Sequence, residues 1–208
     1  PVTINGDGSI TGLSVGGLGA GVVNTATLAD GAATGVKQGA GSIIQCVQGT
    51  FTGVTDTTGT GLVDTGITKN ITVTGSNKVL VSYTCYVSAK AGVYGVRTVL
   101  VRGSSQIFLG DQPSTGLRAT GGGWVSNSLG DHPTWNHSNT FLDTPGAGTH
   151  TYKVQFSSIY TGSHEARVGR PIGGTSNPAY YTTPSHMTLM ERKVCVNYNS
   201  DIVVVNRV

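Results

Sequence analysis

The chain has 208 residues, of which only 11% are charged, and its formal net charge is +3. This length accommodates one domain of ordinary size together with an arm. No run of five basic residues occurs, so nothing supports nucleic-acid binding, and the absence of 18 consecutive apolar residues argues against a membrane-spanning helix.

The first 42 residues differ in composition from the rest of the chain. They contain eleven glycines, no aromatic residue and three charged side chains, Asp7, Asp30 and Lys37. Fixing eleven glycines costs on the order of 5–10 kcal/mol more than fixing as many alanines. Aliphatic side chains are nevertheless spread through the segment, so we predict an extended arm that is ordered by packing against other subunits. The predicted arm-packing residues are Ile10, Leu13, Val15, Leu18, Val22 and Leu28.

Residues 43–191 are typical of an all-β head, because apolar residues recur with a period of two and no ten-residue stretch shows helical spacing. The predicted strands are, in chain order, 42–48, 67–74, 78–89, 94–102, 105–109, 124–125, 139–142, 149–156, 165–168, 186–191, 194–196 and 202–205. The predicted long connections are 110–122, 130–136 and 169–185, and residues 50–61 are predicted to be either a loop or a weakly paired edge strand. This pattern indicates a jelly-roll-like β-sandwich that follows the arm and precedes a C-terminal strand or tail at residues 192–208.

The strongest of these strands spans residues 78–89. Its alternation places five side chains on one face: Val79, Val81, Tyr83, Cys85 and Val87. The segment from Lys90 to Gly92 is short and separates this strand from the one at residues 94–102. We therefore predict a β-hairpin.

Several aromatic residues fall in or beside the long connections rather than in the best strands. Rings presented among hydroxyl and amide groups serve carbohydrate and protein recognition, and loop aromatics also cover the rim of a core. Both interpretations stay open for the candidate recognition residues Trp124, Trp135, Tyr160, Tyr180 and Tyr181.

No catalytic, metal or cofactor site is predicted. His132 and His137 lie in a segment that we interpret as an exposed loop, and their spacing matches no standard set of metal ligands. Cys46, Cys85 and Cys195 are odd in number and widely spaced, which predicts free thiols made in a reducing compartment. The ten acidic residues form no pair suited to acid–base chemistry, and neither a G-x-S-x-G motif nor a phosphate loop occurs. We therefore expect that the protein is not an enzyme.

A set of short segments in the head and the arm resembles a known family. In the head these are SIIQ at 42–45, SNKVLV at 76–81, FLDTP at 141–145, THTYKVQ at 149–155 and TLME at 188–191, and in the arm ITGL at 10–13 and TLADGA at 27–32. Together they look like tail-fibre-like and other virion structural proteins of tailed bacteriophages, particularly phages of cyanobacteria and aquatic bacteria. The resemblance covers most of residues 10–191.

The resemblance implies a virion structural protein, assembled in the host cytoplasm as a homotrimer of jelly-roll-like heads. In the leading hypothesis it is a tail-fibre or appendage component: its arm attaches to other virion proteins and its head contacts a polysaccharide or receptor of the host surface. The alternative is a capsid decoration (cement) protein that stabilises the shell. A third hypothesis, a polysaccharide-degrading enzyme, would need clustered acidic residues. Neither nucleic acid nor a membrane is an expected partner.

Overall fold

The computed structural model describes residues 3–6, 10–11, 38–90, 94–112, 114–125, 134–160, 162, 164–172 and 181–194. The chain divides into two units, residues 1–38 and 39–208. In the first unit, β1 (Thr3–Ile4) and β2 (Ile10–Thr11) form a two-stranded antiparallel sheet. Outside the described residues lie most of the predicted arm-packing positions, Leu13, Val15, Leu18, Val22 and Leu28, and the predicted tail from residue 195 onward.

The second unit is built from strands, as its period-two pattern predicts. Its strands are β3 (Ile43–Phe51), β4 (Thr55–Thr57), β5 (Val63–Val73), β6 (Lys78–Ala89), β7 (Tyr94–Arg102), β8 (Ser105–Ile107), β9 (Gly121–Val125), β10 (Thr134–Asp143), β11 (Gly148–Ser158), β12 (Ala166–Val168) and β13 (Ser185–Arg192). The described part of the chain contains no helix, and hence none that could cross a membrane. The predicted all-β class is confirmed.

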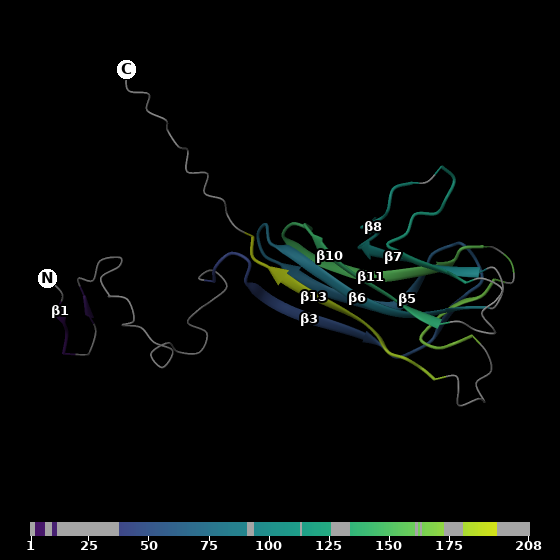
Figure 1. Ribbon diagram of the computed structural model, residues 1–208. Coiled ribbons are helices and arrows are strands. Elements are labelled where there is room, and N and C mark those ends of the chain that lie inside the picture. Colours follow the sequence, from purple (N-terminus) through teal and green to yellow (C-terminus); the bar gives the residue numbers. More distant parts are fainter. Residues whose placement is uncertain are drawn as a thin grey trace, which may run out of the picture. The chain divides into compact units, whose positions relative to one another are not determined.

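These strands form two antiparallel sheets, which Figure 1 shows as the layers of a sandwich. In the first, called the β6 sheet, β6 pairs along one edge with β10 and along the other with β13 and then β12. Strands β3 and β4 extend this sheet beyond β13 and β12. In the second, called the β11 sheet, β11 lies between β5 and β7, and the far edge of β7 pairs with β8 and β9.

The hydrophobic core lies between the two sheets. The five side chains that we predicted on one face of β6, from Val79 to Val87, belong to this core, since each is at most 1% exposed. Opposite them, Tyr152, Val154 and Phe156 of β11 are fully buried. Burial of side chains this large contributes roughly 1.5–3 kcal/mol each, which makes this core the main source of stability of the head.

The predicted hairpin between β6 and β7 is wrong. Strand β6 pairs with β10, β12 and β13, whereas β7 belongs to the other sheet and pairs with β8, β9 and β11. Both strands are mostly buried, so each supplies one wall of the core instead of pairing with the other. The connection at residues 90–93 therefore joins the two sheets.

Two further differences, and one alternative that the sequence left open, concern short or polar strands. Strand β10 covers ten residues, where we predicted a connection at 130–136 and a brief strand at 139–142. Strand β4 lies in residues 50–61 and is a short edge strand, which is one of the two alternatives predicted there, whereas β9 begins inside the predicted connection 110–122. The inward face of β10 includes the buried polar residues His137 and Asp143, so an apolar alternation is not visible in its sequence.

Candidate functional site

An open hollow of about 330 Å³ lies on the β11 sheet, beside the edge formed by β7 and β9. It is called the Trp124 hollow here, after its most exposed aromatic side chain, which is 65% exposed. Leu117, from the connection between β8 and β9, is 46% exposed beside it. The full lining is Val96, Arg97, Leu117, Ala119, Gly122, Gly123, Trp124 and Ile159.

Trp124 is held by a strand ladder rather than by a loose loop. It lies opposite Gly95 in the pairing of β9 with β7. The preceding Gly123 packs on Trp135 of β10, since a Cβ atom at this position would lie 2.4 Å from the indole nitrogen. Only glycine allows this approach of the backbone to the ring. The Trp124 indole therefore projects from a backbone that is held by the pairing with β7 and by the packing of Gly123 on Trp135.

Arg97 brings a positive charge to the hollow. Its guanidinium donates to Ser157 Oγ at 2.8 Å, to the carbonyl oxygen of Arg118 at 2.9 Å and to that of Thr60 at 3.0 Å. All three acceptors are neutral, and the ion pairs among the described residues do not involve Arg97. Burial lowers the pKa of Arg97 from its ordinary value. The charge is thus partly desolvated and positioned, but it has no carboxylate partner among these residues.

A buried polar chain lies behind the hollow and contains His137. Trp135 Nε1 donates to His137 Nε2 at 2.5 Å, and His137 Nδ1 lies 3.2 Å from Thr98 Oγ1. Because Nε2 accepts a hydrogen bond, the neutral ring carries its proton on Nδ1 and donates to Thr98. Burial lowers the pKa of His137 from 6.5 to about 4.

The interpretation of His137 as a loop residue is therefore wrong. It lies in β10 and is only 6% exposed, because its two ring nitrogens find partners inside the sandwich. His132 lies outside the described residues. No group of three metal-binding side chains is found in the described part of the chain.

The predicted aromatic residues do not gather in one patch. Trp124 lines the hollow, whereas the half-buried Trp135 lies in β10 and not in a connection as predicted. Tyr160 is 42% exposed and its ring centroid lies 5.7 Å from that of His164. Tyr181 is 58% exposed and its ring lies 6.2 Å from that of Tyr86 in the β6 sheet. Tyr180 falls outside the described residues.

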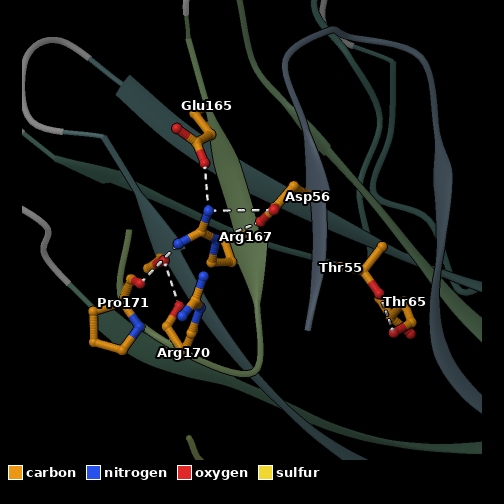
Figure 2. A network of polar contacts seen from close by, with 8 residues as sticks. Thr55, Asp56, Thr65, Glu165, Arg167, Arg170 and Pro171 are labelled. Carbon is orange, nitrogen blue, oxygen red and sulfur yellow. Dashed lines mark hydrogen bonds and ion pairs between the residues drawn. The ribbon is translucent and has the colours of Figure 1, made fainter. Parts of the chain in front are cut away.

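A second charged cluster surrounds Arg167 of β12 (Figure 2). The buried guanidinium forms a two-pronged ion pair with Asp56 of β4 and donates to Glu165 at 2.8 Å. It also donates to the carbonyl oxygen of Pro171 at 3.2 Å. Both carboxylates bind the same guanidinium, so the cluster joins β4 to β12 rather than offering an acid–base pair.

Glu191 of β13 is fully buried and fully hydrogen-bonded. It accepts bonds from the amide and hydroxyl groups of Thr74 and from the side chains of Asn77 and Gln45, at 2.6–2.8 Å. Burial alone would raise the pKa of Glu191, but these bonds outweigh burial and hold it below its usual value. Glu191 thus ties the turn after β5 to strands β3 and β13.

The outer face of the β6 sheet contains no Asp, Glu, Lys or Arg over three rows of side chains, and we call it the neutral face. Cross-strand hydroxyl pairs occur on it, such as Thr84 with Ser138 at 3.0 Å. One row is apolar and runs across four adjacent strands. The rows, each from β10 through β6 and β13 to β3, are Leu142, Leu80, Met190 and Cys46; Thr140, Ser82, Thr188 and Gln48; and Ser138, Thr84, His186 and Thr50.

Sequence reasoning identified Trp124 but missed its neighbours in the hollow. Arg97, Leu117 and Ile159 come from separate segments that only the sheet pairing brings together. The usable signal was the run of three glycines before an aromatic residue at 121–124, since such a run marks a close backbone approach next to an exposed ring.

No protein-family model and no curated protein matches the sequence. A solved structure described as "Structure of infectious bursal disease virus Gx strain" aligns with 9% sequence identity and a TM-score of 0.34. The alignment covers 74% of this chain and 38% of that one, so the chain spans well under half the length of the viral chain. A similarity at this level carries no information about function.

Proposed function

We propose that this chain is a structural protein of a tailed-phage virion, a homotrimeric tail-fibre or appendage component that recognises the host surface. The glycine-rich segment would attach to other virion proteins and hold three copies together. The β-sandwich would then present the Trp124 hollow to a polysaccharide or receptor on the host cell.

The observation that carries this proposal is the exposure of Trp124 on a fixed strand. The Trp124 side chain is 65% exposed, so the fold does not gain the stability that burial of a large aromatic ring gives. We attribute this exposure to contact with a partner. The neighbouring glycines at 122 and 123 carry no side chain that could shield the ring. The aromatic face therefore suits recognition of a ligand.

The composition of the chain supports the assembly part of the proposal. Three copies of the glycine-rich segment could bury its aliphatic side chains together and share the cost of ordering it. The charged fraction of 11% is well below the usual value of about 25%, as suits a protein with much of its surface in contact with others.

The location and copy number of the chain on the virion test the proposal. Antibodies against the head should label the tail or its appendages on intact particles, and mass spectrometry should find a small number of copies, a multiple of three. Labelling of the whole shell with hundreds of copies would overturn the fibre role. It would support the second candidate, a capsid decoration protein.

The neutral face favours that second candidate. A flat, uncharged sheet surface with an apolar row across four strands can lie against a neighbouring subunit without burying an unpaired charge. In this role the chain would clamp adjacent shell proteins. Particles that lack it would then lose their DNA at lower temperature than complete particles.

A further inference from the structure

The Trp124 hollow combines an aromatic face with a cation that lacks an anionic partner among the described residues. A guanidinium has five N–H groups, and the three neutral acceptors of Arg97 occupy one on each nitrogen. Two N–H groups on the terminal nitrogens have no acceptor among the residues that the structure describes. They belong to a side chain that already lines the hollow and is held in place from three directions.

The guanidinium of Arg97 is already held in a position from which it can bind a carboxylate. Its position is fixed before binding, so little side-chain entropy is lost when a ligand arrives. Its partial burial strengthens any pairing with an anion, because water screens the charge less than at an open surface. Arg118 follows Leu117, and its backbone carbonyl holds Arg97, while its own guanidinium donates to the carbonyl oxygen of Gly110.

Trp124 and Leu117 supply the complementary apolar part. The exposed indole offers a flat surface, and the C–H face of a pyranose ring packs on such surfaces while its hydroxyl groups stay hydrated. The adjacent Gly122 leaves the ring open on the strand, and Ile159 adds apolar lining. An aromatic surface beside a cation that can pair with a carboxylate fits a sugar that has both an apolar ring face and a carboxylate.

We propose that the Trp124 hollow binds an acidic saccharide, with a sugar ring on the indole of Trp124 and the sugar carboxylate on the guanidinium of Arg97. This inference rests on the proposed role in surface recognition and specifies its ligand class. A single-stranded nucleic acid also combines rings with negative charge. It requires a track of cations along its phosphates, whereas Arg97 is the one cationic side chain among the described residues that line the hollow.

Binding of defined oligosaccharides to the full chain tests this inference. The probes are oligomers of alginate, polygalacturonate and hyaluronan, each paired with its carboxyl-reduced form, and the readout is calorimetry together with tryptophan fluorescence. At least one acidic oligomer should bind ten-fold or more tightly than its reduced form. Trp124→Ala and Arg97→Lys should each weaken that binding at least ten-fold. Trp124→Ala changes an exposed side chain, so the fold should survive even where changes at Arg97 disturb it.

The matched control is Phe108→Ala, which removes an exposed aromatic residue that stacks on Phe141 and does not line the hollow, and it should leave affinity unchanged. Equal affinity for acidic and reduced oligomers, or no binding to any of them, would overturn the inference. So would binding of a single-stranded oligodeoxynucleotide, but no acidic saccharide, at Trp124.

A competition experiment separates this inference from the proposed function. Soluble wild-type protein should block adsorption of the phage to its host, and Trp124→Ala protein should block it at least ten-fold less well. If both proteins block adsorption equally, surface recognition stands but the hollow is not its site. If neither blocks adsorption although an acidic oligomer binds through Trp124, the recognition function fails and the saccharide site remains.

Discussion

His137 is the buried side chain through which acid should act most directly on the stability of the fold. Its folded pKa of about 4 lies below the ordinary value of 6.5 because burial disfavours the charged ring. Above pH 6.5 the ring is neutral in both the folded and the unfolded chain and has no effect on the pH dependence. Between pH 6.5 and 4 the unfolded chain binds a proton that the folded chain excludes, so stability falls with pH.

We therefore predict a loss of about 2 kcal/mol in the free energy of unfolding between pH 7.5 and 5 from this residue. Urea unfolding at several pH values measures it. His137→Gln should remove most of this slope, whereas His186→Gln, on the neutral face, should retain it. An unchanged slope in His137→Gln would show that another group is responsible. Glu191, whose pKa is lowered, contributes its own loss at lower pH, below its ordinary value of 4.5.

Gly169 is a position where both backbone conformation and space require glycine. Its φ angle is 95°, and a Cβ atom there would lie 2.1 Å from the backbone oxygen of Gly53. We predict that Gly169→Ala lowers the free energy of unfolding by about 3 kcal/mol, because the strained φ adds to a clash with backbone. The control is Gly146→Ala, with a φ of 82° but no atom within 4 Å, which should cost only about 1 kcal/mol. Equal losses in the two variants would contradict the role of the clash.

At the scale of elements, Arg167 supplies the main polar link between β4 and β12. Strand β4 has three residues and bonds only to β12 in its sheet, so its position depends on few contacts besides the ion pair with Asp56. We predict that Arg167→Met costs about 2 kcal/mol and that Arg167→Met and Asp56→Asn are coupled by at least 1 kcal/mol in a double-mutant cycle. The more exposed pair Lys153–Asp64 is the control, with a coupling of about 0.5 kcal/mol. Similar coupling energies for the two pairs would show that the Arg167–Asp56 ion pair links β4 to β12 no more strongly than an exposed ion pair would.

Strands with apolar alternation could be predicted from sequence, whereas polar and glycine strands could not. The bounds predicted for β6 and β7, residues 78–89 and 94–102, agree with the structure, because apolar residues alternate through β6 and β7 is rich in β-branched residues. In β10 the inward positions include His137, Asn139 and Asp143, whose burial depends on hydrogen bonds from other strands. Those partners are distant in sequence, so no local sequence pattern indicates them.

The same limit applies to pairing and to the hollow. Which strand lies beside β6 is decided by the whole sandwich, and the local spacing that favoured a hairpin with β7 carried no information on it. Trp124 could be nominated because it lies beside a long connection rather than in one of the best strands. Arg97 could not, since its neighbours Thr60, Arg118 and Ser157 become neighbours only after folding.

At the scale of the whole molecule, the boundary between the two units lies slightly before the predicted end of the arm. The first unit ends at residue 38, and the segment that follows pairs with the end of the head. Gly41 N donates to the carbonyl oxygen of Lys193 at 2.9 Å, and Lys193 N donates to that of Ser42 at 3.0 Å. Residues 39–42 therefore contribute backbone hydrogen bonds to the head, although their composition resembles that of the arm.

This boundary gives a sharp prediction for truncated chains. Removal of residues 1–38 should leave a head that unfolds at the temperature of the full chain, because every strand from β3 to β13 and both bonds of Lys193 are retained. Removal of residues 1–42 deletes those two bonds and should lower the free energy of unfolding by about 1–3 kcal/mol. Scanning calorimetry of the two truncated chains measures the difference.

The shorter truncation also tests how copies of the chain associate. If the glycine-rich segment joins three chains, the full protein should sediment as a trimer and the protein without residues 1–38 as a monomer that no longer attaches to particles. A trimer that persists without the segment would show that the head holds the copies together. The neutral face could then form the contact, since it can be buried against another copy without burying an unpaired charge. A Leu80→Lys substitution on that face would then separate the two origins: it leaves an arm-held trimer intact and breaks a head-held one.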